Sequence, residues 1–181
     1  MTRYFEPIAI VGGGNCARAL ACHFSSTGRP VYMLVRSLGP VRAIAAARGI
    51  RAVGRMDGEY PLEEVTDDPR RVCGAARDIV VATLATAYPE VMQALAPWLG
   101  PRHRVVLFSG KFGGSLIATR ALRDSGSSTV PVLETDALFA CRTQDDRTVS
   151  LRGVKQWNLC AAPRDSETLA HADFLRHKEH P

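Results

Sequence analysis

The sequence has no apolar run approaching the roughly 18 residues that a membrane-spanning helix needs, and residues 1–7 lack the pattern of a secretory signal. Lysine is scarce. The positive charge comes instead from scattered arginines interleaved with Asp and Glu, and no basic run is longer than Arg70-Arg71. We therefore expect no membrane partner and no nucleic-acid partner, and we interpret the net charge of +5 as solvated surface with some attraction for anionic ligands.

Paired cysteine motifs are also missing. The cysteines number five, which is odd, and none belongs to a C-x-x-C motif. Together with the missing signal pattern, this predicts reduced thiols in a cytoplasmic protein. His171, His177 and His180 lie in a polar stretch without a supporting cluster of cysteines or carboxylates, so we expect no metal site.

The composition of the 181 residues is that of an ordinary globular protein, 46% hydrophobic and 23% charged, which is enough for one core. We predict a single nucleotide-binding domain over residues 1–162. Residues 163–181 are polar and are predicted to form a helical tail; the alternative is that they begin a helical catalytic domain that is truncated here.

The most informative segment is Ile8–Ala17, which reads IAIVGGGNCA. An apolar run is followed at once by the spacing G-x-G-x-x-A, and an apolar stretch comes next. Gly12 permits a tight turn, Gly14 lets the backbone approach a diphosphate closely, and Ala17 lets the helix pack on the strand. The unpaired N–H groups at the helix start would face the phosphates. The segment predicts a dinucleotide site, with a purely structural strand–turn–helix as the alternative.

The end of the second apolar strand, Val31–Val35, bears on which dinucleotide is bound. In this kind of fold the strand end meets the adenosine ribose, where a carboxylate usually accepts a hydrogen bond from the 2′-hydroxyl. Here Arg36-Ser37 follow instead. A guanidinium and a hydroxyl suit a 2′-phosphate, so we prefer NADP over NAD. The alternative is that Arg36 stacks on adenine or faces solvent.

Strands and helices alternate as far as Leu133, which predicts an α/β fold of the Rossmann type, with a doubly wound, mainly parallel sheet and a site at the carboxyl ends of its strands. After Glu134 the pattern changes to a C-terminal antiparallel β-meander, which we expect to close one edge of the sheet. We predict helices over 17–24, 41–48, 70–76, 88–99 and 116–123, and further strands over 50–53, 59–65, 78–84, 105–108, 130–133, 138–143, 148–152 and 155–161.

Four segments resemble those of a known family and occur in the family's order. They are Gly12–Ala17, similar to G-x-G-N-x-[GA]; Leu84–Tyr88, at the place of V-P-A followed by His; Ser109–Gly114, similar to P-G-x-x-G-G; and Glu134–Arg142, similar to E-T-x-x-L-x-x-x-R. The last is the most specific, because a generic dinucleotide fold has no reason to carry it. Over roughly residues 8–163 the chain resembles the N-terminal NAD(P)-binding domain of the opine dehydrogenases, the octopine and nopaline dehydrogenase type that includes the N-(carboxyalkyl)amino-acid dehydrogenases.

The resemblance implies a reaction and a set of cofactor contacts. Members of the family condense the amine of an amino acid with a 2-oxo acid such as pyruvate, and NAD(P)H reduces the imine. The implied cofactor-binding residues are Gly12, Gly14, Asn15, Cys16 and Ala17 at the diphosphate, Arg36 at the adenosine end, and Leu84, Ala85, Thr86, Gly110 and Lys111 on the nicotinamide side. Two of these have an alternative role: Cys16 would only pack against its neighbours, and Lys111 would face solvent.

The departures from the family pattern limit what the resemblance implies. Ala85 stands in place of the usual Pro, Tyr88 in place of the usual His, and Ser109 in place of the Pro before Gly110. The family's second domain, which is helical and carries the acid/base His, has no counterpart before Pro181. We therefore assign no catalytic residue and expect the chain alone to bind cofactor without turnover, with a second domain or a homodimer as the missing partner.

Two classes of function remain open. The first is the cofactor domain of an opine-type dehydrogenase, with ketopantoate reductase-like or glycerol-3-phosphate dehydrogenase-like enzymes as alternatives. The second is a non-catalytic nucleotide-binding module or sensor. Within the family-like segments, we expect Glu134 and Arg142 to form a buried structural pair and Tyr88 to pack at a helix start.

Overall fold

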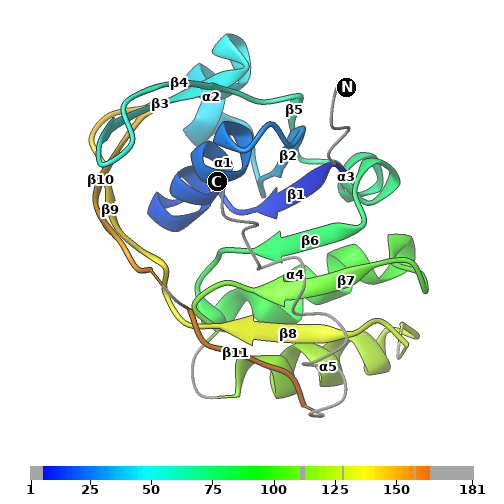
Figure 1. The fold of residues 1–181 in the computed structure, drawn as a ribbon. Coiled ribbons are helices and arrows are strands. Elements are labelled where there is room, and N and C mark those ends of the chain that lie inside the picture. The colour runs from blue at the N-terminus through cyan, green and yellow to red at the C-terminus, as the bar shows by residue number, and fades with distance from the viewer. Residues whose placement is uncertain (1–5, 111–112, 128, 157, 164–181) are drawn as a thin grey trace, which may run out of the picture.

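The computed structural model describes residues 6–110, 113–127, 129–156 and 158–163. Its main sheet has seven strands in the order β11-β8-β7-β6-β1-β2-β5 (Figure 1). Neighbouring strands are parallel except for β11, which runs antiparallel to β8. The strands are β1 (Ile8–Val11), β2 (Val31–Leu34), β5 (Glu64–Thr66), β6 (Asp78–Val81), β7 (Arg104–Leu107), β8 (Val132–Thr135) and β11 (Cys160–Ala161).

Helices cover both faces of this sheet, as the predicted doubly wound fold requires. Two of them, α1 (Asn15–Ser26) and α2 (Arg42–Ala47), pack on one face; α3 (Pro69–Ala75), α4 (Tyr88–Leu95) and α5 (Gly114–Asp124) pack on the other. Short 3-10 helices extend them: η1 (Gly39–Val41) leads into α2, η2 (Ala85–Ala87) leads into α4, and η3 (Ala96–Trp98) follows α4. In the described segments no helix has both the length and the apolarity needed to cross a membrane.

The central strands are buried on both faces, which explains their near-continuous apolar sequences. In β1, Ile8 and Ile10 belong to the core cluster shared with α1, whereas Ala9 and Val11 belong to the cluster shared with α3, α4 and α5. The chain builds β2 on one side of β1 and then crosses to β6 on the other side. That reversal creates a switch point at the carboxyl ends of β1 and β6, which is where ligands bind in sheets of this kind.

A second sheet of four strands, in the order β4-β3-β10-β9, covers α1. Its strands are β3 (Gly49–Gly54), β4 (Gly58–Pro61), β9 (Phe139–Thr143) and β10 (Thr148–Val154). The predicted antiparallel pairing of β9 with β10 is confirmed, but the expectation that this hairpin closes an edge of the main sheet was wrong. Instead, β10 pairs in parallel with β3, and only the short β11 reaches the edge strand β8.

The reason lies in the segment predicted as one strand over 59–65. It divides into β4, which forms a hairpin with β3, and β5, which joins the main sheet beside β2. The hairpin therefore projects past the main sheet and presents the open edge of β3 to β10. Apolar residues of both sheets pack with α1 in one core cluster, so the second sheet buries the outer side of that helix.

Local signals placed most helix ends correctly to within a few residues. The predicted cap of α3 is confirmed, because the Asp68 side chain accepts a hydrogen bond from the Arg70 N–H at 2.9 Å and Pro69 opens the helix. The helix predicted over 88–99 ends earlier, at Leu95, and continues as the 3-10 turn η3, which contains Pro97.

A buried charge cluster joins the amino ends of β6 and β7. Asp78 is 2% exposed and accepts hydrogen bonds from Arg29 Nη2 at 2.8 Å and from Arg104 Nε at 2.6 Å. Burial raises the pKa of Asp78, but the hydrogen bonds and charges of Arg104 and Arg29 outweigh it, and the net pKa is lowered. The cluster lies at the end of the sheet opposite the switch point, so we interpret it as structural.

Candidate functional site

The turn between β1 and α1 has a backbone that only glycine accommodates at its first position. Gly12 has φ +126° and its N–H donates to the Leu34 carbonyl at 2.8 Å. A Cβ added there would lie 2.8 Å from the Ala82 carbonyl oxygen. The glycine is therefore required by the fold itself, since the turn presses against the end of β6.

Gly14 differs from Gly12 in a way that points to a ligand. Its φ of −82° suits any residue, and a Cβ added there would meet no protein atom within 4 Å. The fold therefore does not need a glycine at this position. The open space in front of Gly14 lies at the switch point between β1 and β6, where a diphosphate would approach the backbone.

The start of α1 leaves its positive end uncompensated. Gly14 is the N-cap, no side chain caps the helix, and the first turn contains no acidic residue. The N–H groups of the first turn have no acceptor within the helix. Ala17 is fully buried and lies against the turn, since an added Cβ at Gly12 would be 3.4 Å from the Ala17 Cβ. The unpaired N–H groups and the positive end of the helix dipole thus face the space beside Gly14.

Arg18 anchors this turn to the second sheet. Its Nε donates to the Gly13 carbonyl at 3.0 Å, and its Nη1 donates to the carbonyls of Asp145 and Asp146 at 2.9 and 3.0 Å. The residue is only 6% exposed. The sequence analysis missed this role, although an arginine inside the apolar run 17–22 was the available signal. Arg18 holds the glycine-rich turn and the β9–β10 turn in one arrangement.

We expect the substitution Arg18→Met to lower the free energy of unfolding by about 2–4 kcal/mol, because the alkyl stem stays while three partly buried carbonyls lose a charged donor. The turn is then less well held, and affinity for NADH should fall about tenfold. Urea denaturation and fluorescence titration measure the two effects. Arg42→Met, at an exposed position of α2, serves as the control and should stay within about 0.5 kcal/mol of the parent. Equal stability of the two variants would contradict the anchoring role.

Asn15 and Cys16, both implied as cofactor contacts, also bind the second sheet. The Asn15 Oδ1 accepts a hydrogen bond from the Thr143 N–H of β9 at 2.8 Å. The Cys16 thiol is half-buried and hydrogen-bonded to the thiol of Cys141, also on β9. The side-chain oxygen of Asn15 is therefore committed to the protein, and its backbone N–H at the helix start stays directed at the open space.

The other residues implied as cofactor contacts lie at the same carboxyl edge of the main sheet. Arg36 is exposed two residues beyond β2, and Leu84, Ala85 and Thr86 are exposed in the turn after β6. Gly110 is different, because a Cβ there would lie 2.9 Å from the Cβ atoms of both Glu134 and Leu107. Its glycine is explained by the packing of β7 against β8. Lys111 lies outside the described residues.

The expected pair of Glu134 with Arg142 does not form. The Glu134 Oε2 accepts a hydrogen bond at 2.7 Å from the Ser115 N–H in the first turn of α5, while Arg142 lies on β9 in the second sheet. A carboxylate at a helix start is stabilised by the unpaired N–H groups and the helix dipole, which explains this partner. Tyr88 is 1% exposed, and its ring would be 2.9 Å from an added Cβ at Gly114, which confirms its predicted packing role.

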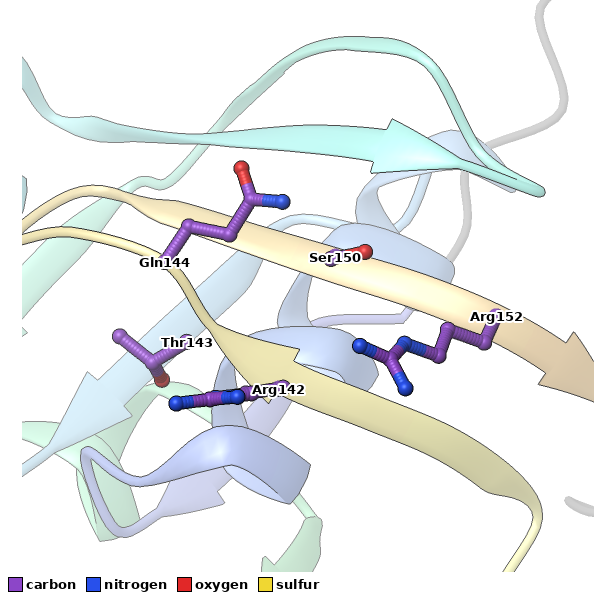
Figure 2. A pocket seen from close by; sticks show the side chains of 5 residues that line it. All are labelled: Arg142, Thr143, Gln144, Ser150 and Arg152. Atoms are coloured by element: carbon purple, nitrogen blue, oxygen red, sulfur yellow. The ribbon is translucent and has the colours of Figure 1, made fainter.

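A polar cavity of about 250 Å³ lies on the β9–β10 hairpin. Figure 2 shows the side chains of Arg142, from β9, and Arg152, from β10, on the same side of the hairpin as Ser150. Thr143 and Gln144 complete the lining. Val149 and Leu151, which alternate with Ser150 and Arg152 along β10, pack in the core cluster with α1, so the cavity lies on the outer face of the second sheet. Its two arginines make that face positively charged.

A larger cavity, about 600 Å³, lies at the opposite end of the sheet. It is formed between α3 on one side and η3 with the segment after it on the other, and its lining includes Cys73, Trp98 and His103. His103 is buried there, with Nε2 2.9 Å from the Cys73 carbonyl. Ligands of open α/β sheets bind at the carboxyl ends of the strands, so this cavity is separate from the candidate site despite its size.

Comparison with known proteins agrees with a dinucleotide-binding fold. Residues 7–115, which run from β1 into the start of α5, match the family model described as the N-terminus of NAD-dependent glycerol-3-phosphate dehydrogenase. The chain belongs to this family. The matched range contains the glycine-rich turn, Arg18 and the switch point between β1 and β6.

Individual relatives extend the comparison. An opine dehydrogenase of Arthrobacter sp. (strain 1C) is 24% identical over 149 residues, which cover 81% of this chain and 42% of that enzyme. A glycerol-3-phosphate dehydrogenase (NAD(P)+) of Edwardsiella ictaluri (strain 93-146) is 29% identical over 107 residues, covering 59% of this chain and 31% of the other. Octopine dehydrogenase solved with NADH and L-arginine superposes with a TM-score of 0.79 at 20% identity, over 94% of this chain and 45% of that one.

These matches confirm both the predicted fold and the predicted resemblance to the opine dehydrogenases. They also include the glycerol-3-phosphate dehydrogenases that the sequence analysis kept as an alternative. The chain spans less than half the length of each of these relatives.

Proposed function

We propose that this chain binds NAD(P)H and serves as the cofactor domain of an oxidoreductase of the opine dehydrogenase type. The observation that carries the proposal is the open space at Gly14, in front of an uncapped helix start at the switch point of the sheet. Bound NAD(P)H would supply the hydride that reduces an imine formed from an amino acid and a 2-oxo acid such as pyruvate. The proposed cofactor contacts remain Gly12, Gly14, Asn15, Cys16, Ala17, Arg36, Leu84, Ala85, Thr86, Gly110 and Lys111.

The segment Glu134–Arg142 favours the opine type over its relatives. The match to the Arthrobacter enzyme covers 81% of the chain, so it necessarily includes residues 134–142, whereas the family model ends at residue 115. A specific observation favours the second candidate, a glycerol-3-phosphate dehydrogenase type of reductase, because the family model carries that description. The ketopantoate reductase type and a non-catalytic nucleotide-binding module are the remaining alternatives.

The residues of this chain would bind and orient the cofactor. The N–H groups at the start of α1 would hold the diphosphate, and Gly14 would give it room. The exposed turn Leu84–Thr86 at the end of β6 would lie on the nicotinamide side. No residue is assigned the proton transfer of the reaction, since the described titratable side chains near the turn are committed to structural bonds or face solvent.

Exposed apolar side chains at the carboxyl ends of the strands support the proposal that another domain or chain covers this edge of the main sheet. Leu84 follows β6 and is 80% exposed, Leu116 lies in the first turn of α5 and is 62% exposed, and Leu159 precedes β11 and is 64% exposed. The Leu159 N–H donates to the Asp136 side chain just beyond β8, which places it at this same edge. A second domain or a second copy of the chain would cover these side chains and complete a substrate site.

We also propose a cytoplasmic location. None of the five cysteines forms a disulfide in the structure, as expected for a protein in a reducing compartment.

Titration of the purified chain with NADH and NADPH, followed by nicotinamide fluorescence, tests the function. We expect both to bind, and NADPH to bind more tightly because the Arg36 guanidinium can pair with the 2′-phosphate. Arg36→Ala should lower the NADPH affinity about tenfold, or about 1.4 kcal/mol, and leave NADH unchanged. With pyruvate and an amino acid added, the chain alone should not consume NADH.

Absence of binding by either nucleotide would overturn the proposed function. Equal affinity for the two nucleotides, unaffected by Arg36→Ala, would overturn only the NADP preference. Arg42→Ala is a matched control, because Arg42 is also exposed but lies on α2, away from the end of β2.

A further inference from the structure

Two thiols far apart in the sequence meet beside the glycine-rich turn. Cys16 is the second residue of α1, and Cys141 lies in the middle of β9. Both are half-buried and pack against the core cluster between α1 and the second sheet, where the two thiols are hydrogen-bonded to each other. They join the helix start, which is the proposed diphosphate site, to the second sheet.

The surrounding hydrogen bonds fix this pair. On one side of Cys16, Asn15 Oδ1 accepts from the Thr143 N–H, and on the other side Arg18 donates to the carbonyls of Asp145 and Asp146. The β9–β10 hairpin is therefore held against the first turn of α1 both before and after Cys16. Such a fixed approach of two thiols favours an intramolecular disulfide over intermolecular ones.

The two thiols differ in reactivity. The hydrogen bond from Cys141 lowers the pKa of Cys16, and the unpaired N–H groups at the start of α1 also stabilise a thiolate at this position. The same hydrogen bond, with burial, raises the pKa of Cys141. Burial raises the pKa of Cys22 to about 12 and that of Cys73 to about 11, which makes those thiols unreactive. Cys16 is therefore the attacking thiol and Cys141 the resolving one.

We propose that Cys16 and Cys141 form an oxidisable dithiol whose reversible disulfide switches off dinucleotide binding. The oxidant is a low-molecular-weight disulfide such as oxidised glutathione. The Cys16 thiolate attacks it, forming a mixed disulfide and releasing one thiolate that takes up a proton. The Cys141 sulfur, losing its proton, then attacks the Cys16 sulfur and releases the second thiol. The dithiol loses two protons and two electrons, and the small disulfide takes up both to become two thiols.

The switching effect follows from the position of Cys16 and rests on the proposed function. A disulfide brings the two sulfur atoms from hydrogen-bond distance to about 2.05 Å, which draws the first turn of α1 toward β9. The N–H groups of that turn then move relative to Gly12, which is fixed against β6. We expect the oxidised protein to bind NADH at least tenfold more weakly. By linkage, NADH must favour the reduced dithiol by the same factor.

The experiment uses a glutathione redox buffer with and without saturating NADH. Peptide mapping of the oxidised protein should find Cys16 linked to Cys141, and reduction with dithiothreitol should restore NADH affinity. Saturating NADH should raise the midpoint potential by about 30 mV for a tenfold difference in affinity between the two forms. Cys141→Ser should bind NADH normally when reduced and form no internal disulfide. Cys160→Ser, which removes a half-buried thiol on β11, should behave as the parent does.

The outcomes separate this proposal from the proposed function. If the reduced chain binds NADH but no Cys16–Cys141 link forms, or if the link forms without changing NADH affinity, the switch is refuted and the cofactor domain stands. If the link forms but the reduced chain does not bind NADH or NADPH, the proposed function is refuted together with the switch.

Discussion

Replacing Gly14 with alanine should weaken NADH binding about 100-fold, or about 2.7 kcal/mol, while leaving the free energy of unfolding nearly unchanged. The added Cβ meets no protein atom within 4 Å and the backbone at Gly14 suits any residue, so the fold should tolerate it. The same Cβ occupies the space in which a diphosphate would approach the helix start. Fluorescence titration and urea denaturation measure the two quantities.

Gly12→Ala provides the contrast. Its Cβ would lie 2.8 Å from the Ala82 carbonyl oxygen at a φ of +126°, so this variant should lose stability as well as binding. Gly74→Ala, in α3, is the matched control: its Cβ also meets no atom, and NADH affinity should not change. If Gly14→Ala bound NADH as tightly as Gly74→Ala does, the space at Gly14 would not be a nucleotide site, and the turn would be structural only.

Removal of the Asp78 carboxylate is expected to have the largest effect on stability. Asp78→Ala should lower the free energy of unfolding by about 3–5 kcal/mol, because it leaves the charges of Arg29 and Arg104 without their buried partner. Asp124→Ala removes a carboxylate from an exposed pair with Arg120 and should cost less than about 1 kcal/mol. Urea denaturation at pH 7 compares them. Equal costs would show that the Asp78 cluster contributes no more than a surface pair.

The same cluster predicts how stability depends on pH. The pKa of Asp78 is lowered in the folded protein relative to about 3.9 in the unfolded chain. Its contribution is therefore fully present above about pH 4 and is lost as the pH falls through the folded-state pKa. The stability difference between the parent and Asp78→Asn should shrink below pH 4 and stay constant from pH 5 to 7. A difference that stayed constant down to pH 2 would contradict this assignment.

Short sequence patterns correctly predicted the parts of the fold whose contacts lie within one short segment of the chain. The strand–turn–helix at Ile8–Ala17 could be predicted because the apolar run and the glycine spacing lie within one short segment, and the cap at Asp68 because it bonds two residues away. The second sheet could not be placed, because its central pairing joins β3 to β10, about a hundred residues later, and no local pattern specifies such a partner. The sequence therefore indicated where the strands of the second sheet lie along the chain, but not which strands pair with one another.

The candidate site shows the same limit at the level of side chains. The glycines were identified from spacing, whereas the anchoring role of Arg18 depends on three carbonyls in two separate turns. Glu134 was assigned the wrong partner, because its bond to the Ser115 N–H depends on where α5 begins relative to β8. Contacts between elements are set by tertiary packing, which one sequence does not show.

The parallel pairing of β3 with β10 also has a consequence for biosynthesis. A ribosome delivers β1, α1 and β3 early, but the strand that completes the cover over α1 ends only at Val154. Until then the outer side of α1 and one edge of the β3–β4 hairpin stay open on the nascent chain, which makes this stage the most exposed to chaperones and to misassembly. The glycine-rich turn, although encoded well before β10, is thus finished among the last parts of the described fold.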